Sequence, residues 1–168
     1  GLSTIAGGNS QMPDWPDHPM TGMKQEFPCL DFVVCTTDDG GSTGRLLKSL
    51  PMIGVGDLRK LLLSCISTQK LERKYALNAG QASELVRAIH GLFNFRFPED
   101  ETGFERVTNP LLAIPPHLRR ACPPTLAQDL RSLGSFISPG GGGPTITPAG
   151  HALGNLLITS AIFEAAGG

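Results

Sequence analysis

The feature that most constrains this chain is the segment Val33–Arg45, which reads VVCTTDDGGSTGR. Its apolar, β-branched beginning is typical of an interior strand, and we predict a strand over Leu30–Thr37. Two adjacent acids, Asp38 and Asp39, end the strand, and the glycines that follow favour a turn. In open α/β sheets the ligand crevice lies just outside the carboxyl ends of the strands. The segment therefore predicts an α/β fold with a nucleotide or phosphate site at this turn.

The turn itself combines the groups that such a site needs. Paired carboxylates hold Mg²⁺, bind a ribose or act as a general base, and glycines let backbone N–H groups face an anion. The alternative is a charged turn that only closes a strand, since Asp and Gly are common in turns. Two acids, three glycines and an arginine within eight residues exceed what a turn requires, so we favour a functional site. We expect Asp38 and Asp39 to be catalytic or metal-binding, and these residues to bind the ligand: Gly40, Gly41, Ser42, Thr43, Gly44 and Arg45.

A second candidate site is the sequence GVGDLRK at residues 54–60. Asp57 is a good N-cap for a helix over Leu58–Ser67, whose apolar residues recur on one face. The free amides and the dipole at such a helix start favour an anion, and Gly56 leaves room for one. The positive charges of Arg59 and Lys60 in the first turn are unfavourable at the positive end of the helix dipole unless a phosphate binds there. The alternative is an exposed helix start that tolerates its basic residues, and the loop is not a Walker A motif because no GK[ST] follows the glycines.

A third candidate site is the sequence GHALGN at residues 150–155. We expect a helix from about His151 to Ala166, on which His151 and Asn155 share a face at the N-terminus. Gly154 between them lets another backbone or a ligand come close. A lone histidine near a helix start is more often a cap or a packed residue than a catalyst, so a structural role stays open beside the binding role.

The rest of the chain predicts helices and loops. We expect helices over 45–50, 81–93 and 125–137, and an irregular segment over 94–124. The Gly/Pro-rich loop at 138–150 is typical of a flexible linker, with phosphate binding as the alternative. Only one strand is evident, which is too few for a stable sheet, so its partners are expected in irregular segments or outside this chain.

The composition of the chain limits the classes of function and partner that we expect. The length of 168 residues fits one domain, and a net charge of −1 argues against a general nucleic-acid partner. No apolar run reaches the roughly 18 residues of a membrane span, so we expect no membrane partner. Four scattered cysteines without a CxxC spacing predict reduced thiols and a cytoplasmic location, with Cys35 and Cys65 buried.

The three motifs, in this order, resemble the 2-phospho-L-lactate transferase (CofD) family. TTDDGGSTGRL, GVGDLRKLLL and GHALGNLL are most similar to its YvcK-like branch, the gluconeogenesis factors, over residues 1–168, with 70–150 matching poorly. The resemblance implies a Rossmann-like three-layer α/β fold with a parallel sheet, incomplete in this chain. Similar members begin with a strand and a GGGTGLS-type loop, of which Gly1-Leu2-Ser3 remains, and they continue beyond the last helix. We therefore expect residues 1–168 to form a single partial nucleotide-binding domain.

The resemblance also implies a function. Transferase members move a phospholactyl group from a guanylylated donor to a deazaflavin hydroxyl, whereas YvcK-like members bind UDP-sugars and influence carbon metabolism and cell shape. The GGSTGR continuation is similar to the second branch, so we expect a cytoplasmic regulator that binds a nucleotide-sugar or related conjugate. The transferase is the alternative, and a chain that is inert by itself is a third. Mg²⁺ is a candidate cofactor, and a homodimer is a candidate assembly. Matched motif positions add these ligand-binding residues: Gly1, Gly56, Asp57, Arg59, His151, Gly154 and Asn155.

Overall fold

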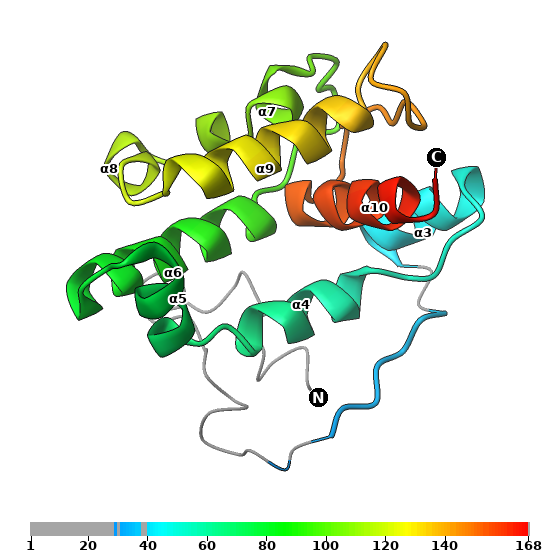
Figure 1. The fold of residues 1–168 in the computed structure, drawn as a ribbon. Helices are drawn as coiled ribbons and strands as arrows, with labels where there is room; N and C mark the ends of the chain where they lie inside the picture. Colours follow the sequence, from blue (N-terminus) through cyan, green and yellow to red (C-terminus); the bar gives the residue numbers. More distant parts are fainter. Residues whose placement is uncertain (1–28, 30, 38–39, 168) are drawn as a thin grey trace.

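The computed structural model describes residues 29, 31–37 and 40–167, and this part of the chain is helical (Figure 1). The helices predicted over 81–93 and 125–137 are confirmed, with ends that differ by one or two residues. Several short helices occupy segments for which no helix was expected. In chain order the helices are α3 (Gly41–Ser49), α4 (Gly56–Ser64), α5 (Thr68–Tyr75), α6 (Ala79–Asn94), α7 (Glu105–Thr108), the 3₁₀ helix η1 (Pro110–Ala113), α8 (Pro116–Arg119), α9 (Pro124–Phe136) and α10 (Leu153–Ala165).

The strand predicted over Leu30–Thr37 is not found in the described residues 31–37. Val33 is 93% exposed, and the β-pairing seen in the described part of the chain is an isolated bridge outside this segment. A strand is stabilised by a neighbouring strand that pairs with its N–H and C=O groups. No described segment supplies such a neighbour, so the expectation of a buried strand in a parallel sheet is wrong for these residues. The Thr36 carbonyl instead accepts a hydrogen bond from the Gly54 amide at 2.6 Å.

Helix α10 forms the centre of the described fold. Its first eight residues, Leu153–Ser160, are all buried. A helix that is apolar on every side must be covered on every side, and α10 contacts α4, α6 and α9. In Figure 1 the red α10 lies between the yellow α9 and the α4 helix below. The start of α10, which carries the third motif, is therefore fixed inside the molecule.

The glycine run at residues 140–143 packs on the C-terminal end of α9. The Gly143 amide donates to the Phe136 carbonyl at 2.9 Å, and the Gly141 amide donates to the Ser138 carbonyl at 3.0 Å. A Cβ at Gly143 would overlap the Phe136 ring. Gly141 and Gly143 are therefore needed for close packing, while Gly140 and Gly142 adopt positive φ angles, so the run is a packed turn in this structure.

The cysteines follow the prediction in part. All four are free in the structure, and their reduced state stays a prediction. Cys35 is exposed and Cys65 is half-buried, so the expectation that both are buried is wrong. The strand that was to bury Cys35 is missing from the described residues, and Cys65 lies at the C-cap of α4. Among the described residues, no helix is long and apolar enough to cross a membrane.

Candidate functional site

Three segments that are distant in sequence meet at the N-terminal ends of α3, α4 and α10. Thr43 of α3 fills the space beside Gly56 of α4, where an added Cβ would lie 2.6 Å from the Thr43 Oγ1. Arg59 of α4 lies against Gly154 of α10, where an added Cβ would lie 2.7 Å from the Arg59 Cδ. Ser42 of α3 is hydrogen-bonded to the start of α10. The structure thus brings the three sequence motifs together.

Helix α3 begins at Gly41, four residues earlier than predicted. Gly40 is its N-cap, and Gly41 adopts a left-handed φ of 51°, which explains the need for glycine there. The Gly44 amide donates to the Gly40 carbonyl at 3.1 Å, so the chain is already helical at this point. The predicted glycine turn is therefore limited to Gly40 and Gly41. Ser42, Thr43 and Gly44 are buried residues of the first helical turn, whose amides lie at the positive end of the helix dipole.

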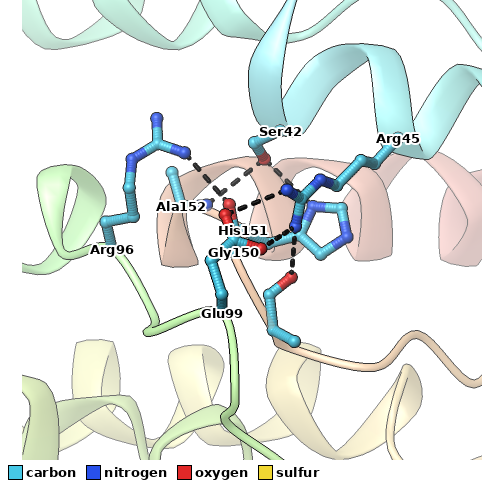
Figure 2. A network of polar contacts seen from close by, with 8 residues as sticks. Ser42, Arg45, Arg96, Glu99, Gly150, His151 and Ala152 are labelled. Carbon is cyan, nitrogen blue, oxygen red and sulfur yellow. Dashed lines mark hydrogen bonds and ion pairs between the residues drawn. The ribbon is translucent and has the colours of Figure 1, made fainter.

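The Ser42 hydroxyl is the centre of a buried hydrogen-bond network (Figure 2). It accepts from the Ala152 amide at 3.2 Å and from the Asn155 Nδ2 at 3.1 Å, and it lies 3.0 Å from the His151 Nδ1. A hydroxyl has one hydrogen and two lone pairs. Because both lone pairs are used, the hydroxyl hydrogen is donated to the His151 Nδ1, and the ring proton belongs on Nε2. The network therefore requires a neutral His151.

The surroundings of His151 favour the same state. Burial lowers the pKa of His151, and the positive charges of Arg45 and Arg96 lower it further, while a backbone contact with Ser42 and the charge of Glu99 oppose the shift. His151 precedes α10, whose first residue is Leu153 and whose N-cap is Ala152. The helix expected from about His151 to Ala166 is confirmed with ends that differ by one or two residues, but His151 lies just before the N-cap, and His151 and Asn155 meet at the Ser42 hydroxyl.

The start of α4 differs from the prediction. Val55, and not Asp57, is the N-cap, and it makes no side-chain capping hydrogen bond. Asp57 lies in the first turn, where its charge suits the helix dipole, and it forms an ion pair with Lys60 at 3.1 Å. The opposing charge of Lys60 is thereby compensated within the chain, and the room expected beside Gly56 is taken by Thr43.

Arg59 is a residue of α4 whose side chain reaches the C-terminal end of α6, and it is only 7% exposed. Its Nη1 donates to the carbonyl of Phe93, in the last turn of α6, where carbonyls lack helical partners. Burial lowers the pKa of Arg59 to about 10, with a further contribution from the charge of Arg96. Two buried atoms here have no hydrogen-bond partner among the described residues: the Arg59 Nε and the Asn155 Oδ1. Arg59 thus caps a helix, and a donor and an acceptor remain unused near Gly154.

Arg45 forms a two-pronged ion pair with Glu99 across the motif junction (Figure 2). The two nitrogen–oxygen distances are 2.7 and 2.9 Å, and Arg45 also donates to the Ala149 carbonyl at 3.2 Å. Arg96 donates to the Gly150 carbonyl at 3.0 Å. Neither Arg96 nor Glu99 was predicted as a site residue, since both lie in a segment without periodicity and far from position 45 along the chain.

The electrostatics of the junction favour an anion. The first turns of α3 and α10 meet at Ser42, and each helix start carries a partial positive charge. The guanidinium groups of Arg45 and Arg96 add two positive charges, one of which is balanced by the Glu99 carboxylate. Backbone amides and arginines in such an arrangement bind phosphate or carboxylate groups.

Three candidate residues lie outside the described part of the chain: Gly1, Asp38 and Asp39. Asp38 and Asp39 immediately precede the N-cap of α3 in sequence. In the described residues, no group of three or more metal-ligating side chains is found. The expectation that the acid pair binds a metal therefore stays a prediction.

Comparison with known proteins identifies a family. A family model described as 2-phospho-L-lactate transferase CofD matches residues 17–166, which is most of the chain and includes all three motifs. The matched range includes residues 70–150, the segment expected to fit the family least well. No curated protein and no solved structure matches the chain.

Proposed function

The chain belongs to the 2-phospho-L-lactate transferase CofD family, and we propose that it binds a nucleoside-diphosphate conjugate of the UDP-sugar type. The family implies a Rossmann-like fold, in which a nucleotide lies against helix starts. The observation that carries the proposal is the meeting of the α3, α4 and α10 starts, each from a different sequence motif. We further propose a YvcK-like, gluconeogenesis-factor-like role in the cytoplasm, in which binding regulates carbon metabolism and cell shape.

The residues at the junction suit the parts of such a ligand. The amides at the start of α3, which begins at the exposed Gly41, would face the diphosphate, with the Arg45 guanidinium one helical turn further along. The unused Asn155 Oδ1 is a buried acceptor suited to a ligand hydroxyl or N–H group. Asp38 and Asp39 would bind the ribose or a Mg²⁺ ion, because carboxylate oxygens are preferred by both.

A second candidate function is favoured by the description of the family model, which names 2-phospho-L-lactate transferase. In this case the chain would transfer a phospholactyl group from a guanylylated donor to a deazaflavin hydroxyl. Catalysis would depend on positioning and on electrostatic stabilisation of the transferring group. Asp38 would then accept the proton of the attacking hydroxyl.

Calorimetric titration separates the two candidates. The ligands are UDP-N-acetylglucosamine and GDP with a deazaflavin, each with and without Mg²⁺. Saturable binding of the UDP-sugar, with the ligand intact after hours of incubation, supports the regulatory binding protein. Binding of GDP together with the deazaflavin, and consumption of a guanylylated donor, would replace it with the transferase.

The acid pair is tested by Asp38→Asn. We expect at least tenfold weaker binding or turnover with an unchanged thermal midpoint, because the substitution keeps the shape of the side chain and removes its charge. Asp31→Asn, an exposed acid seven residues earlier, is the matched control. Unchanged affinity and rate in Asp38→Asn would remove Asp38 from the site.

A further inference from the structure

Glu99 occupies the position that a ligand phosphate would take on Arg45. Its two carboxylate oxygens accept from the two terminal nitrogens of the Arg45 guanidinium, at 2.7 and 2.9 Å (Figure 2). Arginine binds carboxylates and phosphates with this same pair of parallel hydrogen bonds. A phosphate cannot use this face of Arg45 while Glu99 is bound to it.

The fold makes specific room for the pair. Gly150 has a left-handed φ of 68°, and an added Cβ would overlap the Arg45 Nη1 and lie 2.6 Å from the Glu99 Oε2. The neighbouring Ala149 carbonyl accepts a further hydrogen bond from Arg45. Gly150, the first residue of the third motif, must therefore be glycine to leave space for the ion pair of Arg45 and Glu99.

The surroundings of Glu99 are cationic. Its hydrogen bond to Arg45 lowers the pKa of Glu99, burial opposes this shift, and the charges of Arg45 and Arg96 add to it. The helix starts of α3 and α10 lie at the same junction. The Glu99 side chain is nevertheless 73% exposed and that of Arg45 is 46% exposed, so solvent weakens their attraction. The carboxylate is well placed but weakly held.

We propose that Glu99 is a built-in competitor for the anion position on Arg45, which a diphosphate group displaces on binding. A diphosphate offers the same pair of oxygens with a larger negative charge, and it would also reach the start of α3 at the exposed Gly41. A ligand with a single carboxylate gains no such advantage over Glu99. Glu99 would thus select diphosphate conjugates against monocarboxylates, an inference that rests on the proposed function of this site.

The test compares UDP binding to the parent chain, Glu99→Gln and Asp100→Asn by calorimetry at fixed ionic strength. Glu99→Gln keeps the side-chain shape and frees Arg45 from a charged partner. Asp100→Asn removes the same charge from the next residue, which is exposed and has no ion pair with Arg45 among the described residues. We expect UDP to bind at least fivefold more tightly to Glu99→Gln, and less than twofold more tightly to Asp100→Asn. Circular dichroism melting confirms that all three chains fold.

A second pair of variants shows whether the gain acts through Arg45. In an Arg45→Gln background, adding Glu99→Gln should change UDP affinity less than twofold, because no arginine is left to be freed. Equal affinities in the parent and Glu99→Gln, or equal gains in Glu99→Gln and Asp100→Asn, would overturn the competitor while leaving the binding site in place. Absence of saturable UDP binding in every variant would overturn both the competitor and the proposed function.

Discussion

The sharpest structural prediction concerns Ser42→Ala, which removes the hydroxyl at the junction of α3 and α10. This hydroxyl is hydrogen-bonded to three buried groups: the Ala152 amide, the Asn155 amide group and the His151 ring. Ser42 is 3% exposed, Asn155 is 2% exposed and His151 is 6% exposed, so water does not readily replace the lost partner. The substitution therefore leaves several buried polar atoms unsatisfied at once.

The expected loss follows from counting these atoms. Each buried donor or acceptor that loses its partner costs about 1 to 3 kcal/mol. The His151 ring and the Asn155 side chain have rotatable bonds, so we take the lower end of this range for each group. The sum is a loss of about 3 kcal/mol in the free energy of unfolding.

Urea denaturation at pH 7 measures this loss. Ser49→Ala is the matched control, because Ser49 is on the same helix and its exposed hydroxyl donates to the Arg45 carbonyl at 3.2 Å. The control should change stability by less than about 0.5 kcal/mol. A Ser42→Ala loss below about 1 kcal/mol, or one equal to that of the control, would refute the hydrogen-bond network as described.

Three further predictions test the packing and the titration of the described fold. Gly154→Ala should lower the free energy of unfolding by about 2 kcal/mol, because its Cβ would lie 2.5 Å from the Phe93 carbonyl oxygen and overpacking outweighs the gain in helix propensity. Gly91→Ala is the control, because its Cβ would meet a side chain, that of Ile114 at 3.1 Å, and not a backbone atom. Equal urea midpoints for the two variants would contradict the close packing at Gly154. Gly150→Ala should destabilise by about 1 kcal/mol or more and separate Arg45 from Glu99, and a thermal midpoint equal to that of the parent would count against this. Burial lowers the pKa of His90 from 6.5 to about 4. As the pH falls, the unfolded chain therefore binds a proton on this histidine at a higher pH than the folded chain does. The free energy of unfolding that is present above pH 6.5 is lost as the pH falls to about 4. The loss is about 3 kcal/mol, and urea titrations that show the same slope with pH in His90→Gln would contradict it.

Local signals in the sequence predicted the longer helices but missed the short ones α5, α7, η1 and α8. The helices over 81–93 and 125–137 were found because their apolar residues recur with the helical period. The true start of α6 at Ala79 also had a local signal, the reciprocal capping box of Asn78 and Gln81, which went unused. The second and third motifs were placed near helix starts, since glycines and capping residues mark such positions, whereas the first was expected in a strand and turn but contains the start of α3.

The remaining features depend on contacts that no local pattern encodes. The apolar run before the acid pair has the composition of a strand, but a strand forms only beside another strand. The first turn of α3 contains residues with weak helix propensity, yet Ser42 and Thr43 are held there by contacts with α10 and α4. The ion pair of Arg45 and Glu99 joins two distant segments, and the spacing of the two residues in the sequence does not predict it.

The most direct test of the proposed site is to follow the backbone amide signals of the ¹⁵N-labelled chain by NMR during titration with UDP-N-acetylglucosamine. If the three motifs form one site, the amides of residues 40–45, 56–59 and 150–155 will shift together, with a single dissociation constant. Shifts confined to other segments, or three motifs that respond with different dissociation constants, would contradict a shared site at the starts of α3, α4 and α10.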